Sequence, residues 1–308
     1  MTETTSGTAS EQQQPIDPET WSPGPLRPAS TAARTPLPFR VELARQFTQW
    51  RIRGLLLVLA LLPIAIRIAF LIGTQPDDGS TTTDQTLTLA DTAQDSGVLF
   101  ATFTLSVTGG FLLTLVVALL FGDMIASEAS RSTLKYLLTI PVSRGRLLAT
   151  KIGVSLVVFA TGLVLLAGVA LIVGLLSYGN AGLQVPEGPQ LSFGASIARI
   201  AGAIGFLFLH LLWAAALGTL LTVVTDTPLG AAGGVVLATI LSNILDAIPN
   251  LGNFRYLLPT HFSGSWRQLF ASPTNWDLVA NSVLSSLLYA LIFGVWAAWH
   301  FGRKDISS

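Results

Sequence analysis

Six long stretches of almost uncharged, apolar sequence limit what this chain can fold into. A bilayer core about 30 Å thick is crossed by roughly 20 apolar residues in a helix. Six windows reach that length, at about residues 54–74, 98–122, 152–177, 197–224, 229–248 and 279–301. Their Leu, Ala, Val and Gly runs do not alternate with polar residues, which favours helices over the strands of a β-barrel. The sequence therefore predicts an all-α integral membrane protein with six transmembrane helices.

The composition agrees with a membrane protein and excludes several classes of function. Only 11% of the 308 residues are charged, about half the fraction in soluble domains. The net charge is zero, which provides no field for binding nucleic acid. There is no Cys, so disulfides, thiolate metal sites and Cys nucleophiles are excluded. The three His residues form no HExxH pair and no G-x-S-x-G motif occurs, so we expect neither a catalytic nor a metal site.

Lys and Arg are distributed asymmetrically among the loops. Six Arg precede the first window, five basic residues lie between the second and third windows, and two follow the last. The loops at 75–97 and 178–196 contain no basic residue. Because cytoplasmic loops carry an excess of Lys and Arg, both termini and the loop 123–151 are predicted to be cytoplasmic, in a multi-pass protein of the cell membrane.

The chain before the first window divides into two parts. Residues 1–36 are rich in Thr, Ser, Gln and Pro, so we expect a disordered cytoplasmic tail. Within residues 37–53, one stripe of a helix carries Phe39, Leu43, Phe47 and Trp50. This pattern predicts an amphipathic helix in the inner membrane interface; the alternative is a basic flank that only fixes the topology. Residues 54–308 then form the six-helix transmembrane domain.

Two connections near the end of the chain have distinctive sequences. The tetrapeptide TDTP at 225–228 predicts a tight turn between antiparallel helices, with Pro228 near the start of the second. The external segment 249–277 is rich in aromatic residues, which prefer the headgroup layer. We expect a pair of short helices dipping into the membrane there, with an ordinary interfacial loop as the alternative.

The stretch SEASRSTLKYLLTIPVSRGRLLATK, residues 127–151, separates two apolar windows with an amphipathic, basic segment. Leu134, Leu137, Leu138 and Pro141 gather on one side of a helix. Pro141 ends or kinks this helix, and Ser143 is placed to cap the next one, which runs into the third window. The residues leave two interpretations open: a rigid helix–turn–helix lip that carries a push from a soluble partner into the bilayer, or a solvated basic loop that enforces topology.

This stretch resembles the signature of ABC type 2 (ABC-2) transporter permeases, E…TL…LL…P-V-S-R…LL…K. The residues that carry the resemblance are Glu128, Thr133, Leu134, Leu137, Leu138, Pro141, Val142, Ser143, Arg144, Leu147, Leu148 and Lys151. The six windows, the amphipathic helix before them, the apolar last external segment and the basic tail FGRKDI are also similar to that family, so the resemblance covers about residues 39–306. The family usually has Gly-Thr where this chain has Ser132-Thr133.

The resemblance implies a permease subunit of an ATP-driven exporter that is not an enzyme by itself. In that family, two six-helix subunits form the translocation path, and a cytoplasmic coupling helix between helices 2 and 3 docks on a separate ATPase. By resemblance, the ATPase-coupling residues of this chain are Glu128, Arg131, Thr133, Leu134, Leu137, Leu138, Pro141, Arg144 and Lys151. The implied partners are an ABC ATPase subunit, a second permease copy in a homodimer, and membrane lipid.

No cofactor is expected in this chain. A P-loop requires Gly-Lys followed by Ser or Thr, and the three Lys here are followed by Tyr, Ile and Asp. ATP and Mg would therefore bind to the partner ATPase.

Four polar residues within the windows are candidates for a translocation path, because such residues are rare in membrane spans and often functional. Arg67 is placed to snorkel outward or to contact lipid or substrate. His210 is placed to make a helix–helix hydrogen bond or to contact substrate. Asn243 and Asp246 lie near the outer end of the fifth window, where they face protein or an exit vestibule.

Two other classes of function are considered. A stand-alone secondary transporter or channel is disfavoured because no window carries a charged pair, an obvious discontinuous helix or an internal repeat. An intramembrane enzyme would need clustered acid, base or nucleophile groups, which the sequence lacks; a non-transporting membrane assembly factor is the other form of this alternative. A Walker A protein encoded beside this chain would favour the permease.

Overall fold

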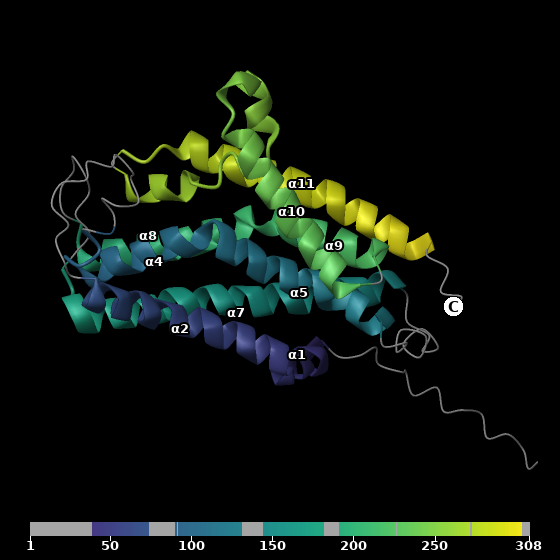
Figure 1. Cartoon of the computed structure of the whole chain (residues 1–308), viewed down its shortest axis with the longest axis horizontal. Coiled ribbons are helices and arrows are strands. Elements are labelled where there is room, and N and C mark those ends of the chain that lie inside the picture. Colours follow the sequence, from purple (N-terminus) through teal and green to yellow (C-terminus); the bar gives the residue numbers. More distant parts are fainter. Residues whose placement is uncertain are drawn as a thin grey trace, which may run out of the picture. The chain divides into compact units, whose positions relative to one another are not determined.

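The computed structural model describes residues 39–73, 90, 92–130, 144–181, 191–225, 227–271 and 273–303, with only the backbone for 127–130 and 144. All regular secondary structure in these residues is helical, which confirms the predicted all-α class (Figure 1). In chain order the elements are α1 (Phe39–Thr48), α2 (Trp50–Ile72), α4 (Gly97–Gly109), α5 (Phe111–Ser130), α7 (Arg144–Tyr178), α8 (Phe193–His210), α9 (Leu212–Val224), α10 (Pro228–Asp246), the 3₁₀ helices η1 (Pro249–Leu257) and η2 (Ser265–Phe270), and α11 (Trp276–Arg303).

Five of the described helical segments are long and apolar enough to cross a membrane. They are α2, α7, the run of α8 and α9 taken together, α10 and α11. The pair α4 and α5 passes the same test when it is counted as one bent span. The chain is therefore a helical membrane protein in which several apolar helices are long enough to span a bilayer.

The bend between α4 and α5 differs from the sequence analysis, which predicts one uninterrupted span at 98–122 and no discontinuous helix. The two helices meet at an angle of 57°. Two consecutive glycines lie at the break, and Gly110 takes φ −76° and ψ −87°, outside the helical region. The hydroxyl of Thr114 donates to the Gly110 carbonyl at 2.9 Å, so the polar backbone keeps a partner. Hydropathy depends on composition and not on the direction of the helix axis, so it cannot reveal a bend of this kind.

The helices that pack together come from distant parts of the sequence. α2 and α4 pack on α7, α5 packs on α9 and α10, and α11 packs along α9. Two contacts depend on glycine. A Cβ on Gly97 of α4 would lie 2.5 Å from the backbone N of Leu175 in α7, and one on Gly122 of α5 would lie 2.7 Å from the backbone N of Ala232 in α10. Such small residues allow membrane helices to approach closely.

The helix predicted over residues 37–53 is divided in the structure. α1 ends at Thr48, and Gln49 is extended, with ψ 130°, before α2 begins. Leu43 and Phe47 of the predicted stripe pack against the core of the protein. Trp50 belongs to α2 and is 86% exposed, because the turn at Gln49 moves it off the face of α1.

The segment between α10 and α11 contains the predicted pair of short helices, η1 and η2. Phe254 and Tyr256 of η1 are exposed. Trp266 and Phe270 of η2 are buried in the main core, because η2 packs back onto α8 and α11. The expectation that all these aromatic side chains lie at the headgroup layer is therefore wrong for η2.

The predicted turn at 225–228 is confirmed. α9 ends at Val224, α10 begins at Pro228, and the two helices pack against each other. Proline suits the first position of a helix because its missing N–H would have no partner there. The predicted tail of residues 1–36 lies outside the described residues.

Candidate functional site

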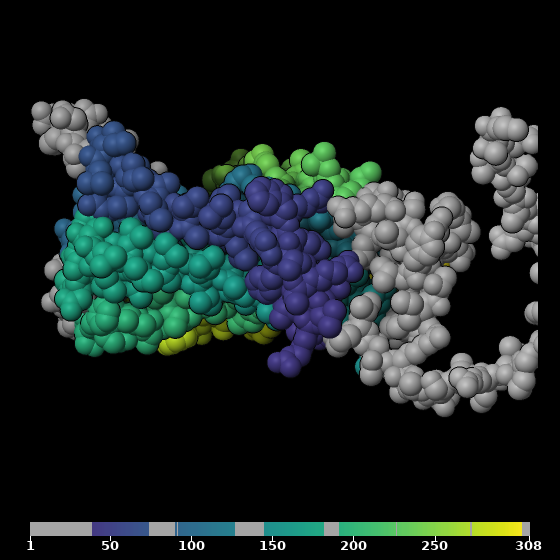
Figure 2. All heavy atoms as spheres, turned by 90° about the horizontal axis from the view of Figure 1, so that it is seen from below, coloured from purple at the N-terminus to yellow at the C-terminus, as the bar shows by residue number. Residues whose placement is uncertain are grey.

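A cleft of about 1490 Å³ lies between α1 and α2 on one side and α5 and α10 on the other. Figure 2 shows α1 and the start of α2, in purple, on the face of the bundle beside α7, in teal. The polar side chains of the lining belong to Glu42, Arg45, Gln46, Thr48, Gln49, Arg51, Asp123 and Lys151, and the apolar ones include Leu55, Val58, Leu112, Leu115, Val116 and Leu119. The cleft therefore combines a charged region with an apolar one.

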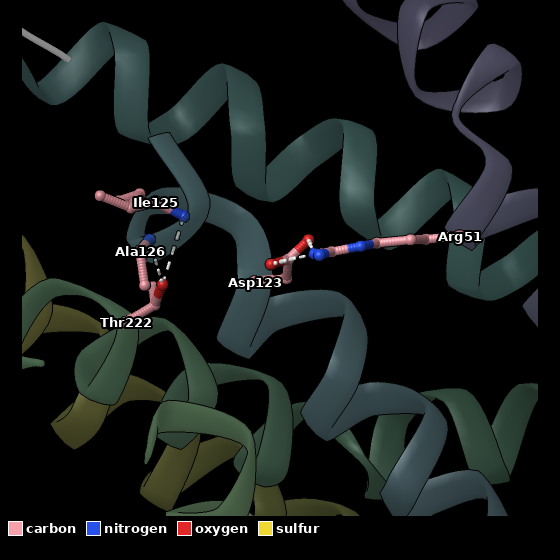
Figure 3. Close-up of polar contacts among 5 residues, drawn as sticks. All are labelled: Arg51, Asp123, Ile125, Ala126 and Thr222. Carbon is pink, nitrogen blue, oxygen red and sulfur yellow. Dashed lines mark hydrogen bonds and ion pairs between the residues drawn. The ribbon is translucent and has the colours of Figure 1, made fainter. Parts of the chain in front are cut away.

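An ion pair joins the two walls of the cleft (Figure 3). Nη1 of Arg51, at the start of α2, lies 2.9 Å from Oδ1 and 3.0 Å from Oδ2 of Asp123 in α5. α2 packs mainly on α7 and α5 mainly on α9 and α10, so the pair connects helices whose main packing partners differ. The Arg51 side chain is 62% exposed and that of Asp123 27%. Because solvent screens such a pair, it contributes little to stability and mainly positions the guanidinium.

A second ion pair in the lining is buried. Nζ of Lys151 in α7 lies 3.4 Å from Oε1 of Glu42 in α1, and each side chain is only 6% exposed. Oε2 of Glu42 also lies 3.6 Å from Nη1 of Arg45. A buried charge that loses its partner is strongly destabilising, so this pair fixes α1 against α7.

A small apolar cluster lies close to the cleft. Its buried members are Met124, Ile125, Leu148, Val223 and Phe301, from α5, α7, α9 and α11. Thr222 of α9 strengthens the contact with α5, because its Oγ1 accepts hydrogen bonds from the backbone N–H groups of Ile125 at 3.2 Å and Ala126 at 3.0 Å (Figure 3). One end of each of these four helices is therefore held in a single packed unit.

Most of the predicted ATPase-coupling residues lie outside the described side chains. Arg131, Thr133, Leu134, Leu137, Leu138 and Pro141 fall within 131–143, and Glu128 and Arg144 are described by their backbone alone. The helices on either side are described: α5 runs to Ser130 and α7 begins at Arg144, where a helix capped by Ser143 is predicted to start. Lys151 is the one coupling residue whose side chain is placed, and it binds α1.

His210, a predicted residue of the translocation path, is buried between helices. Its Nδ1 lies 3.2 Å from Oγ of Ser282 and 3.0 Å from Oγ of Ser286, both in α11. Ser282 also donates to the carbonyl of Phe262, in the segment before α11, at 3.2 Å. His210 therefore connects α8 to α11, as one of its two predicted interpretations requires.

The other three predicted path residues contact different parts of the chain. The guanidinium of Arg67 lies 4.9 Å from the ring centre of Tyr178 at the end of α7. Asn243 is exposed, and Asp246 pairs with two basic residues of the segment that follows α10. None of the four predicted path residues lines the cleft.

Glu42, Arg51 and Asp123 were not predicted as site residues from the sequence. A signal was present, because Asp123 directly follows the second window and Arg51 lies three residues before the first. With the predicted topology these opposite charges lie at the same membrane face, where they can pair. Nothing in the sequence alone indicates that α2 and α5 stand opposite each other, so the pairing needed the fold.

These features define the class of this protein: a helical membrane protein with a partly charged cleft between its spans. The chain belongs to the family described as "Protein of unknown function (DUF2705)", whose model matches residues 61–307. That match begins within α2 and covers every helix after it. No curated protein matches the chain.

Proposed function

We propose that this chain is the membrane-spanning permease subunit of an ATP-driven exporter of the ABC-2 type, which acts as a dimer with a separate ATPase. The observation that carries the proposal is the pattern over residues 127–151, in which an amphipathic leucine face is followed by Pro-Val-Ser-Arg and a second leucine pair. That segment would be the cytoplasmic coupling helix, and α1 the amphipathic helix that precedes the spans.

The proposal counts α4 and α5 as one bent span, which gives six crossings. Contacts in the bundle support alternating directions for these crossings. The Arg51–Asp123 pair brings the start of α2 to the last part of α5. The cluster of Met124, Ile125, Leu148, Val223 and Phe301 adds the start of α7 and the ends of α9 and α11, and Pro228 at the start of α10 lines the cleft. A chain that crosses six times from a cytoplasmic N-terminus has these six helix ends on the cytoplasmic side.

The surroundings of the segment 131–143 fit a coupling role. α5 and α7, which lead into and out of it, share the apolar cluster with α9 and α11. Lys151, one of the coupling residues, is ion-paired with Glu42 of α1. A displacement that an ATPase transmits from this segment to α5 and α7 would therefore reach α1 and four of the proposed spans through packed contacts.

The test is capture of the tagged full-length chain from gently solubilised native membranes, followed by identification of its partners. We expect a stoichiometric protein with a Walker A motif, and we expect Leu137→Asp to lower its recovery because a charge disrupts an apolar docking face. Leu26→Asp, the same change in the N-terminal tail, is the matched control. Equal amounts of both variants in the membrane fraction would exclude a defect in insertion, and equal recovery of the partner would refute the coupling role.

A stand-alone secondary transporter or channel is the second candidate. The observation that favours it is the 57° bend between α4 and α5, since discontinuous helices are frequent in such transporters. A chain that is captured alone and drives flux with a proton or sodium gradient would support this candidate over the ABC permease.

A further inference from the structure

The cleft between α2, α5 and α10 opens on the outer surface of the bundle. Val58 of α2, Leu119 of α5 and Leu229 of α10 line it and are exposed. In a membrane, an apolar surface of spanning helices faces lipid chains. Trp50, which also lines the cleft, is 86% exposed beside the charged region, and Trp is typical of the headgroup layer. The apolar part of the cleft is therefore accessible from the acyl chains and the charged part from the headgroups.

The charge that is most accessible in the cleft is the guanidinium of Arg51. Both of its bonds to Asp123 come from Nη1, so its Nη2 and Nε donors are bonded to no residue in the described part of the chain. The only buried pair among the charged lining residues, Glu42 with Lys151, is internally compensated. Asp123 thus holds Arg51 in place and leaves the N–H groups at Nη2 and Nε available to a ligand.

We propose that this cleft binds a membrane amphiphile whose phosphate headgroup carries a net negative charge, with its acyl chain along α2 and α5 and its phosphate bound by Arg51. Arginine forms paired, charge-assisted hydrogen bonds with phosphate oxygens, and the open side of its fork fits that geometry. The apolar residues one to two turns further along the walls, Leu55, Val58, Leu115 and Leu119, provide the surface for the chain.

Binding of a lipid in the cleft requires only that the protein lies in a membrane, and it does not depend on an ATPase. Its failure and the failure of the permease proposal are therefore distinguishable. The capture experiment reports on residues 127–151, whereas a lipid experiment reports on the cleft.

The chain has no Cys, so one introduced Cys can carry a fluorescent probe at a chosen place. Leu119→Cys places the probe in the cleft. Val295→Cys is the control, because Val295 is exposed on α11 and does not line the cleft. Val295 lies six residues before Phe301, and Leu119 lies six residues before Ile125, which belongs to the same apolar cluster. The two probes are therefore at a similar distance from that cluster along their helices. Both full-length proteins are reconstituted in phosphatidylcholine vesicles that contain an equal small fraction of brominated phosphatidylglycerol or brominated phosphatidylcholine.

We expect brominated phosphatidylglycerol to quench the probe at Leu119→Cys with about fivefold preference over brominated phosphatidylcholine, as one charge-assisted contact at a partly exposed site would give. At Val295→Cys the two lipids should quench equally. Adding Arg51→Ala should remove the preference and Arg51→Lys should retain only part of it. Arg53→Ala should leave it unchanged, because Arg53 binds the Phe47 carbonyl and does not line the cleft.

Three outcomes would overturn the proposal. Equal quenching by both lipids at Leu119→Cys would show no selective site. Binding of inorganic phosphate that depends on Arg51, with no preference between the two lipids, would show a site for a free anion instead of a lipid. Absence of quenching together with cross-linking between Leu119→Cys chains would show that a second copy of the chain fills the cleft.

Discussion

The two ends of the helical bundle are held together by polar contacts of different reach. At the end with the charged cleft, Arg51 pairs with Asp123, 72 residues away, and Lys151 pairs with Glu42, 109 residues away. These contacts join helices that are distant in the chain. Each is made by side chains, and the first is largely exposed.

At the opposite end, the long-range hydrogen bonds of side chains go to backbone carbonyls, as that of Arg199 to Ala271 does at 3.2 Å, and the pairs between side chains are local. Asp246 pairs with His261, 15 residues further on, and Ser242 shares a hydrogen bond of 2.7 Å with Thr260, 18 residues further on. α4 and α7 meet there backbone to backbone at Gly97. The segment after α10 is therefore bonded back to α10 by its own side chains, in addition to the packing of η2 on α8 and α11.

The end with the charged cleft can therefore change its arrangement at a lower cost in free energy than the opposite end. A local contact closes a short loop and does not depend on how distant helices are placed. A backbone contact at a glycine tolerates no added atom. The exposed pair at the cleft, in contrast, can exchange partners without repacking any helix. We expect substitutions at the packed end to cost more than the loss of that pair.

The largest effect is expected for Gly97→Ala. The new Cβ would lie 2.5 Å from the backbone N of Leu175, so α4 and α7 must separate. Overpacking of this kind destabilises by about 3 kcal/mol. The measurement is the fraction of detergent-solubilised protein that stays monodisperse after heating. Gly168→Ala in α7 is the control, because its Cβ would meet no atom within 4 Å; an equal loss in both variants would contradict the close approach.

A smaller loss is expected for Lys151→Met. It leaves Glu42 buried, with the more distant Arg45 as its remaining ionic partner in the described part of the chain, which costs about 2 kcal/mol. Adding Glu42→Gln should restore most of the stability, because no uncompensated charge then remains. The same heating assay compares the three proteins. No recovery in the double variant would mean that Lys151 acts through something other than this pair.

In the pair of Asp246 and His261, the change His261→Ala should destabilise the protein by about 1 kcal/mol, since a hydrogen bond to a carboxylate is lost at a partly exposed site. Asp246 keeps its contact with Arg255, 3.4 Å away, which limits the effect. Combining His261→Ala with Asp246→Asn should cost less than the sum of the single changes, because the two residues share one contact. Full additivity, measured by the heating assay, would show that the residues act separately.

The smallest loss of stability is expected for Arg51→Ala, below about 1 kcal/mol, because the pair is exposed and screened. The difference from the parent protein should shrink further in high salt. The heating assay at low and high salt measures both. A loss as large as that of Lys151→Met would mean that the two ion pairs of the cleft are not as different as their exposure indicates.

The positions of the apolar helices were predictable, because length and composition determine which segments can cross a membrane. The turn before Pro228 was predictable for a similar reason, since proline there has a local effect on the chain. The bend at Gly110 was not, because glycine permits a bend without requiring one. The position of Trp50 outside α1 was not predictable either, because it depends on the extended backbone of the single residue Gln49 between the two helices.

The candidate site was predicted only in part. Lys151 was identified as a coupling residue through the resemblance, but its burial against Glu42 depends on a contact 109 residues away. Asp123 carried a signal of its own, as an acid at the edge of an apolar window. The cleft itself needed the relative placement of α1, α2, α5 and α10, which periodicity and charge counts do not contain.

The two ion pairs of the cleft have a consequence for how the chain is made. Both lie within residues 42–151, so each charged partner is synthesised before α8 begins. The charges of the first half can therefore be neutralised while the ribosome is still adding the second half, and domains of a chain generally fold in that order. The later helices bring their own polar partners, as His210 does with Ser282. We therefore expect insertion into the bilayer to proceed in two stages, with these polar side chains paired within each stage.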